Sequence, residues 1–369
     1  MTPLYLDANA TEPLRPEARA AALAALDLVG NPSSVHADGR AARRVLEEAR
    51  ARVAARFGAA ARDVVFTSGG TEANALAIAS LRRGRRVLAG ATEHPAVLRA
   101  AEGAETLPVL GDGTLDLEAM ARALTEGAPA LVCLMAANNE TGVIHPLAEA
   151  AALCRRHGAL LHLDAVQAAG RIALSFAESG ADSLAVSGHK MGGPKGAGAL
   201  LLRPGLDLAP LVAGGGQERG RRGGTEALPA IAGLGAAALA ADPAAAARLA
   251  PMRDAIEAAL GLPVAGAGAP RLPNTACLVL PGVPAETQVI ALDLEGVRVS
   301  AGAACSSGKV ARSPVLAAMG LGEAAGEAIR VSLPWNAPDD AVERFLAAHR
   351  TVRARLRPGN GGGALRAVG

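Results

Sequence analysis

Aromatic side chains are scarce in this chain of 369 residues, which contains four phenylalanines, one tyrosine and one tryptophan. Half of the residues are nonetheless apolar, so a large core can form, and it must consist mostly of alanine, leucine and valine. The length suits two domains better than one. A surplus of one charge is also lacking, because the net charge is +2 at pH 7. This near-neutral balance argues against a nucleic-acid-binding surface.

The chain also lacks the long apolar segments that mark exported and membrane proteins. Residues 1–7 do not join a basic region to an apolar run, so we expect no signal peptide. The longest uncharged stretch, 227–241, is too short to cross a bilayer. The cysteines are Cys133, Cys154, Cys277 and Cys305. We interpret all four as reduced thiols, and their spacing fits no metal site. The sequence therefore predicts a cytoplasmic protein without a membrane segment or a metal.

Short apolar runs alternate with helical patterns along the chain. Strands are predicted at 64–66, 86–89, 131–135, 160–163, 184–186 and 199–202. Helices are predicted from an N-cap at Asp38 to Gly58, and over 71–81. Strands separated by helices indicate an α/β fold with a parallel-rich sheet covered on both faces. In such sheets, ligands bind at the carboxyl ends of the strands.

Composition changes in the last third of the chain. The segment 236–270 is rich in alanine, proline and glycine, and we expect it to lead through a long helix into a second domain. Strand and helix patterns resume over 274–350. Residues 358–369 are glycine-rich and lack periodicity, so we expect a disordered tail there.

Two charged residues follow predicted strands closely. Asp164 comes directly after 160–163, and Lys190 lies in a Ser-Gly-His-Lys run just after 184–186. A single lysine is ordinarily a surface residue, but a lysine and an acid at neighbouring strand ends are what pyridoxal phosphate (PLP) requires. The lysine holds the aldehyde as a Schiff base, and the acid keeps the pyridine nitrogen protonated. Other polar residues close to these strand ends are Gln167, Ser187 and His189.

Two glycine-rich segments are candidates for binding a phosphate. Residues 67–72 place glycines and hydroxyls at the start of a predicted helix, where free N–H groups attract anions. An ordinary capped helix would have the same composition. Residues 214–225 contain six glycines and three arginines. They suit a plain surface loop less well, because so much glycine is costly unless backbone must approach something closely.

Three further residues carry chemistry of their own. His94 follows the strand 86–89 and has a side chain that can stack on a flat ring and move protons, although a structural histidine is the simpler interpretation. Asn139 follows the strand 131–135, where it serves either a turn or a ligand. Cys305 lies among small residues, which indicates an exposed loop. A thiol there, near Lys309, is a candidate nucleophile.

These motifs occur in the order and at the spacing of the cysteine desulfurases of the NifS/IscS type, and the sequence resembles that family over nearly its whole length. The matching segments are 6–11, 30–34, 67–72, 92–94, 138–142, 162–167, 187–190, 193–196, 214–225, the loop around Cys305, and 329–332. The resemblance implies the PLP-dependent transferase fold type I. A large domain over 13–245 would hold a mostly parallel seven-stranded sheet flanked by helices. Residues 1–12 and 246–357 would form a smaller α+β domain with the catalytic cysteine loop.

The resemblance also implies which residues hold the cofactor. Lys190 would bind the PLP aldehyde, Asp164 would face the pyridine nitrogen, and Gln167 would face the phenolic oxygen. His94 would stack on the ring and act as acid and base. The phosphate would be held by Gly70, Thr71, Ser187, His189 and Thr225. Of these, Thr225 would come from the neighbouring subunit, so the resemblance implies a homodimer with shared sites.

On the substrate side, the resemblance implies a reaction with L-cysteine. Asn139 would lie beside cofactor and substrate, and Arg330 would bind the substrate carboxylate with its planar pair of donors, with help from Asn31. Cys305 would accept the sulfur as a persulfide while L-alanine leaves. A sulfur-acceptor protein, such as an iron–sulfur scaffold, would then receive it.

Other interpretations remain open. A selenocysteine lyase or a class V aminotransferase would share the fold, as would a non-catalytic sulfur-assembly module. Cys305 argues against an aminotransferase, which needs no such thiol, and the combination of Lys190, Asp164 and Cys305 argues against a non-catalytic protein. The chain departs from the family at Glu12 and at Pro334-Trp335, and both changes could alter packing on the substrate side.

Overall fold

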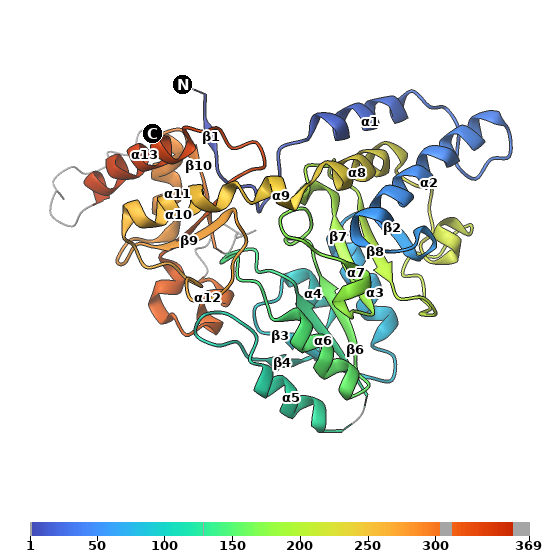
Figure 1. Cartoon of the computed structure of the whole chain (residues 1–369), viewed down its shortest axis with the longest axis horizontal. Coiled ribbons are helices and arrows are strands. Elements are labelled where there is room, and N and C mark those ends of the chain that lie inside the picture. Colours follow the sequence, from blue (N-terminus) through green and yellow to red (C-terminus); the bar gives the residue numbers. More distant parts are fainter. Residues whose placement is uncertain (1, 128, 303–311, 357–369) are drawn as a thin grey trace, which may run out of the picture.

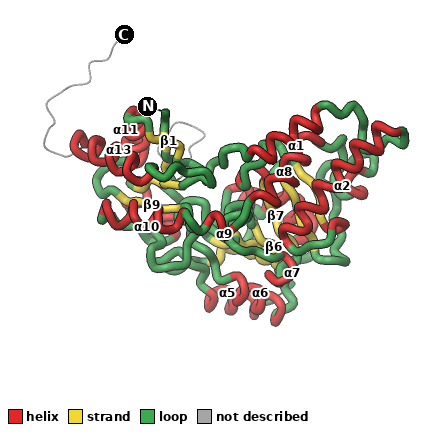
Figure 2. Tube along the Cα trace, turned by 45° about the horizontal axis from the view of Figure 1, so that its top comes forward, coloured by secondary structure: helices red, strands yellow, loops and turns green. Residues whose placement is uncertain are grey.

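The computed structural model describes residues 2–127, 129–302 and 312–356. Cys305 and the tail 358–369 lie outside this part of the chain. Figure 1 shows two lobes, a larger one built on the main sheet and a smaller one that brings the N-terminal strand beside the last described helix. Helix α9 (Pro243–Ala246) lies between the lobes in both views (Figures 1 and 2).

The large sheet has the strand order β2-β8-β7-β6-β5-β3-β4. Its strands are β2 (Val64–Thr67), β3 (Arg86–Gly90), β4 (Glu105–Leu107), β5 (Ala130–Met135), β6 (Leu160–Asp164), β7 (Ser183–Ser187) and β8 (Gly198–Leu202). The pairings from β7 to β4 are parallel, and β8 is antiparallel to both of its neighbours. The six strands predicted for this region and the mostly parallel sheet are thus confirmed. The prediction missed β4, a short strand with exposed residues at the edge of the sheet.

Helices cover both faces of this sheet, and the alternation of side chains along each strand decides which face each residue meets. In β2, Val64 and Phe66 pack with the helices of one face, whereas Val65 packs with α3 on the other. The first face holds α2 (Ala37–Phe57), α5 (Leu117–Thr125), α6 (Leu147–Arg156), α7 (Phe176–Ser179) and α8 (Leu228–Ala240), with α1 (Pro16–Leu26) against α8. The second face holds α3 (Gly70–Leu81) and α4 (Pro95–Ala100).

The smaller lobe has its own core and two small sheets. Strand β12 (Ala328–Ser332) lies between β11 (Ser300–Ala301) and β9 (Thr275–Val279), all antiparallel, and β1 (Leu4–Tyr5) pairs parallel with β10 (Val297–Arg298). The helices are α10 (Leu249–Leu260), α11 (Ala285–Leu294), α12 (Pro314–Ala318) and α13 (Ala341–Leu356). Leu4 and Leu6 share a buried cluster with Ile256 and Phe345. The first residues therefore pack with the end of the chain, while the domain limits at 13 and 246 stay predictions.

Two helix predictions were wrong in detail. The N-cap of α2 is His36, whose Nδ1 accepts from the Gly39 N–H at 3.4 Å, and Asp38 lies in the first turn instead. Gly58 ends α2 in the left-handed conformation, as predicted. The expected long helix into the second domain is three helices, α8, α9 and α10. It breaks at Asp242-Pro243, because proline cannot supply the helical N–H.

Single-turn 3-10 helices complete the described elements, at η1 (Ala61–Asp63), η2 (Gly188–Lys190), η3 (Gln217–Gly220) and η4 (Gly322–Gly326). Among the described residues, no individual helix has both the length and the apolarity to cross a membrane. One bent pair, α8 with Pro243–Leu260, reaches those limits only when its two parts are taken together across a 68° break.

Candidate active site

A cavity of about 240 Å³ opens at the carboxyl ends of β5, β6 and β7. It collects side chains from five separate segments of the chain. The lining residues are Gly70, Thr71, Asn74, His94, Ala96, Met135, Ala137, Asn139, Asp164, Val166, Gln167, Ser187, His189 and Lys190. The fold therefore brings together nine of the residues that the sequence predicted for one site, from Gly70 to Lys190, around a space of ligand size.

Asp164 forms the floor of this cavity at the end of β6, and 5% of its surface is exposed. Its Oδ1 accepts from the Val166 N–H at 2.9 Å, and its Oδ2 accepts from the Asn74 amide at 2.6 Å. Burial raises the pKa of Asp164, and the two hydrogen bonds and the neighbouring His94 and Lys190 lower it. A carboxylate held in this way offers its remaining lone pairs to a cation or an N–H group in the cavity.

Lys190 follows β7 within the short helix η2. Its Nζ donates to the carbonyl oxygen of Asn9 at 2.5 Å and to that of Ala10 at 2.8 Å. Burial, aided by the cations Arg171 and Arg330 and opposed by Asp7 and Asp164, lowers the pKa of Lys190 to about 7. Near neutral pH Lys190 is therefore a free amine in a large fraction of the molecules, and the free amine is the form that attacks a carbonyl carbon.

Glycine is required at position 70, where α3 begins. A Cβ atom there would lie 2.6 Å from Cγ2 of Val166, so any larger residue would clash. The open N–H groups of the first turn of α3, together with Thr71 and Ser187, form the donor-rich end of the cavity. His189 also lines this end; burial, aided by nearby cations, lowers the pKa of His189 to about 4, so its ring is neutral.

The first turn of α3 also carries a negative charge that the glycine-rich loop neutralises. Glu72 accepts from the Ser68 N–H at 2.8 Å, and its Oε1 pairs with Nε of Arg222 at 2.8 Å. The loop 214–225 is thereby tied to the helix that begins at Gly70. An anion at the start of α3 meets the helix dipole and no free carboxylate.

His94 is the N-cap of α4 and lies at the rim of the cavity. Its Nδ1 accepts from the Ala96 N–H at 3.1 Å, so a neutral ring carries its proton on Nε2. Burial lowers the pKa of His94. The ring is consequently uncharged at neutral pH and can lie against a flat ligand as well as exchange a proton.

Arg330 lies behind Asn139, in the middle of β12. Its Nη2 forms an ion pair with Asp7 at 2.7 Å, and its Nη1 donates to the Asn139 carbonyl at 3.1 Å. The Nε atom of this buried side chain has no partner in the described structure. An unsatisfied guanidinium N–H in a buried side chain is a strong donor without a partner, which is rare in a folded protein.

The two positions that depart from the family pattern contact each other. The Trp335 N–H donates to Oε2 of Glu12 at 3.1 Å, and the indole Nε1–H donates to the Pro13 carbonyl at 2.8 Å. Glu12 also pairs with the buried Arg171 at 3.2 Å. The departures at 12 and 335 thus form one contact that holds Arg171, one of the two cations that lower the Lys190 pKa.

Three of the described residues predicted for the site, Asn31, Thr225 and Arg330, do not line the cavity. Asn31 is exposed in the turn before α2, where its Oδ1 accepts from the Ser33 N–H at 2.8 Å. Thr225 is exposed at the end of the glycine-rich loop. Neither residue lines the cavity within one chain. Cys305 lies outside the described residues, so its predicted role stays a prediction.

Three residues that sequence reasoning missed also shape the site. Asn74 holds Asp164, and Arg171 and the carbonyl of Asn9 set the surroundings of Lys190. The helical spacing of four residues from Gly70 to Asn74 could have indicated that both face the same side. No comparable signal exists for Arg171 or Asn9, because their contacts join distant segments.

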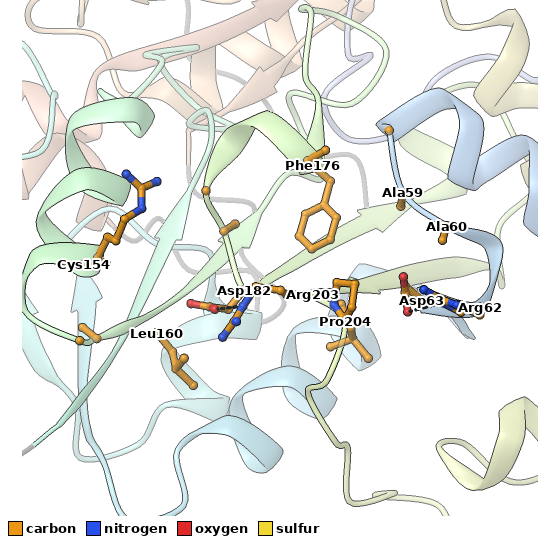
Figure 3. Close-up of a pocket in the computed structure, with 18 residues that line it drawn as sticks. Ala59, Ala60, Arg62, Asp63, Cys154, Leu160, Phe176, Asp182, Arg203 and Pro204 are labelled. Atoms are coloured by element: carbon orange, nitrogen blue, oxygen red, sulfur yellow. Dashed lines mark hydrogen bonds and ion pairs between the residues drawn. The ribbon is translucent and has the colours of Figure 1, made fainter.

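A larger cavity of about 610 Å³ lies at the opposite ends of the strands (Figure 3). It is lined by Leu160 at the start of β6 and by Asp182 just before β7. Four of the five charged residues in its lining form two ion pairs, Arg203 with Asp182 at 2.6 Å and Arg62 with Asp63 at 3.9 Å. The described residues that line it include no lysine, whereas the smaller cavity holds Lys190 together with Asp164 and His94. The smaller cavity is therefore the better candidate for chemistry.

Comparisons with known proteins identify the family of the chain. The family described as "Aminotransferase class-V" matches residues 4–345. A cysteine desulfurase of Cereibacter sphaeroides is 43% identical over 378 residues, covering 96% of this chain and 93% of its own. A solved NifS-like protein of Rickettsia africae is 31% identical, with a TM-score of 0.89, and covers 95% of this chain and 99% of its own. Another solved structure, described as "SspA in complex with cysteine", is 28% identical with a TM-score of 0.79. The match covers 90% of this chain and 99% of that structure's chain.

The family match extends from β1 into α13, so it spans both lobes. It includes the segments that line the cavity. The seven-stranded sheet with its parallel core and the small antiparallel sheet agree with the fold expected from the sequence. On these grounds the chain belongs to the class V aminotransferase family and, within it, to the cysteine desulfurases of the NifS/IscS type.

Proposed function

We propose that this chain is a PLP-dependent enzyme that converts L-cysteine to L-alanine and takes the sulfur onto Cys305 as a persulfide. The observation that carries the proposal is the pairing of Lys190, with its lowered pKa, and the buried Asp164 in one cavity. Relatives named cysteine desulfurase and the neighbour solved with cysteine support the choice of substrate.

The residues of the cavity suit PLP along its whole length. The donor-rich start of α3, with Ser187 nearby, suits a phosphate, and Gly70 leaves room for it to approach. Asp164 suits a pyridine nitrogen and Lys190 an aldehyde. When bound, PLP supplies a protonated ring that withdraws electrons from the substrate α-carbon.

The side chains of the chain then have distinct tasks. The unpartnered Nε–H of Arg330, beside Asn139, supports a role in binding the substrate carboxylate. The free amine of Lys190 accepts the proton from the substrate α-carbon at Nζ, and Nε2 of His94 is the second proton carrier. The thiolate of Cys305 attacks the substrate sulfur. The sulfur–carbon bond breaks as the sulfur–sulfur bond forms, and the carbon keeps the electron pair, takes up protons and leaves as L-alanine.

The segments on either side of Cys305 support this role. Ser300 pairs with Arg330 across β11 and β12. Glu140, next to Asn139, accepts from Oγ of Ser313 at 2.5 Å, and a Cβ on Gly302 would lie 2.5 Å from the same carboxylate oxygen. Both described ends of the segment that contains Cys305 therefore lie beside the cavity. Three residues reach at most about 11 Å from Gly302.

The proposal includes a homodimer. Thr225 and Asn31 are exposed and do not line the cavity of their own chain, which suits residues that serve the site of a second copy. We expect sizing of the purified protein to give the mass of two chains, and an active monomer would contradict the shared site. An acceptor protein, such as an iron–sulfur scaffold, would take the persulfide sulfur onward.

The pH dependence of cofactor capture tests the state of Lys190. Because only the neutral amine reacts, and burial lowers the pKa of Lys190 to about 7, capture of PLP by the apoprotein should accelerate as the pH rises through about 7 and then level off. An ordinary lysine, with a pKa of 10.5, would keep accelerating well above that. The rate is measured from the absorbance change on mixing. Lys195→Ala, which changes an exposed neighbour, should leave the profile unchanged.

Incubation with L-cysteine tests the reaction itself. The PLP-loaded protein, without reductant, should release one L-alanine for each persulfide that forms on Cys305, and added thiol should then make turnover continuous. Alanine is measured by chromatography and the persulfide by mass spectrometry after alkylation. Release of 3-mercaptopyruvate with conversion of the cofactor to its amine form would identify an aminotransferase. Turnover of selenocysteine alone would identify a selenocysteine lyase.

A further inference from the structure

Asp164 is the end of a buried chain of hydrogen bonds that the proposed mechanism does not use. Asn74 contacts Asp164 at 2.6 Å, His162 contacts Asn74 at 2.9 Å, and Ser183 contacts His162 at 2.8 Å. All four side chains are buried, with exposures between 0 and 5%. Side-chain networks of this length are costly in a core unless every member is satisfied.

The direction of each bond follows from the acid. An ionised carboxylate can only accept, so the NH₂ group of Asn74 must face Asp164. The amide oxygen of Asn74 then faces Nε2 of His162, which must carry the ring proton. The remaining nitrogen, Nδ1, accepts from the hydroxyl of Ser183. Each of the four side chains makes at least one hydrogen bond within this network, and His162 has a single possible tautomer.

The sheet and α3 hold this chain in place. His162 and Asp164 are two residues apart on β6, so both side chains point to the same face. Ser183 is the register partner of His162 on the neighbouring strand β7. Asn74 is four residues after Gly70 and faces the same side of α3. One helix therefore sets both the donor-rich end of the cavity and the amide that holds the acid.

The hydrogen-bonded side chains Asn74, His162 and Ser183 bring no charge to Asp164. Burial lowers the pKa of His162 to about 3, so the ring is neutral at physiological pH. A cation in this position would compensate the carboxylate, whereas a neutral donor orients it and leaves its charge to interact with the cavity. With Val166 holding Oδ1 and Asn74 holding Oδ2, the carboxylate cannot rotate.

We propose that Asn74 and His162 are positioning residues that hold Asp164 as an oriented carboxylate opposite the pyridine nitrogen of PLP. This inference rests on the proposed function. It adds that the strength of PLP binding, and the protonation of its ring, depend on two residues that do not touch the ring nitrogen.

Substitution of Asn74 tests the inference through binding and absorbance. Asn74→Ala should weaken PLP binding about tenfold or more, because it removes a hydrogen bond to a buried charge. It should also shift the absorption bands of the bound cofactor and the pH at which they titrate. Asn74→Asp, of equal size, should weaken binding further, since it places a second carboxylate beside Asp164. Ser80→Ala on the same helix, whose hydroxyl bonds to Ala209, is the matched control.

Two measurements at His162 separate positioning from packing. His162→Gln keeps a donor toward Asn74 and should largely restore the binding and spectrum that His162→Phe loses. Nitrogen-15 NMR of the apoprotein should show His162 as the neutral Nε2–H tautomer without titration between about pH 5 and 8. This readout needs no bound cofactor and no variant that might fail to fold.

The outcomes distinguish this inference from the proposed function. Wild-type protein that takes up no PLP would overturn the proposed function and this inference with it. Normal PLP uptake, with Asn74→Ala unchanged in both affinity and spectrum, would overturn the inference alone. A His162 ring protonated on Nδ1 would also overturn it, since Asn74 could not then face Asp164 with its amide nitrogen.

Discussion

Lys190→Ala should abolish covalent attachment of PLP and lower L-cysteine turnover by about 10³-fold or more, since one side chain supplies both the amine and the proton carrier. The whole chain has only three lysines, Lys190, Lys195 and Lys309. Of the two lysines in the described part of the chain, Lys190 lines the cavity beside Asp164 and Lys195 does not. The variant should still bind PLP non-covalently, because the groups expected at the phosphate and the ring nitrogen remain.

Reduction with borohydride gives the measurement. In the wild type it should fix PLP to Lys190, which mass spectrometry of the peptides can locate. Lys195→Ala is the matched control, because Lys195 is exposed in the same loop region and should retain attachment and turnover. PLP found on Lys195 or Lys309 in the wild type would show that the site has been assigned to the wrong lysine.

The strands of the large sheet could be predicted because they are buried on both faces. In β5, all six residues are buried, so the strand reads as a continuous apolar run. At the edge, β4 has two exposed residues out of three and left no such signal. Polar residues directly after the central strands then had to converge at one end of the sheet. This rule suffices to predict that Asp164 and Lys190 lie together.

Contacts between distant segments could not be predicted in the same way. Arg171 bonds to Glu12 and to the Ala8 carbonyl, and Trp335 bonds to Glu12, so this cluster depends on how the N-terminal segment meets two other regions. The sequence marked Glu12 and Trp335 only as departures from a pattern. Their effect on Lys190, through Arg171, follows from the fold alone.

Local competition explains the wrong helix start. His36 and Asp38 can both cap a helix, and an aspartate is the more common choice. The chain uses His36, which leaves Asp38 in the first turn, where its charge is favourable with the helix dipole. Two acceptable caps two residues apart cannot be ranked from sequence, because the free energy that separates them comes from packing elsewhere.

Cys305→Ser should leave PLP binding and its absorbance unchanged and lower alanine formation about 10²-fold or more, because a hydroxyl cannot replace a thiolate as the sulfur acceptor. The other cysteines cannot substitute for it. Cys133, Cys154 and Cys277 are buried, and burial raises the pKa of Cys154 and of Cys277 to about 12. A buried thiol with a raised pKa is inert as a nucleophile.

Cys154→Ala is the matched control, since Cys154 lines the larger cavity at the far ends of the strands and should not affect turnover. Alanine release and persulfide mapping on both variants give the result. Unchanged alanine release by Cys305→Ser would rule out sulfur transfer to this residue and favour a reaction that needs no thiol. Retained PLP absorbance with lost turnover would instead separate the two halves of the site. Lys190 and Asp164 would then hold the cofactor, and Cys305 would determine that the reaction is desulfuration.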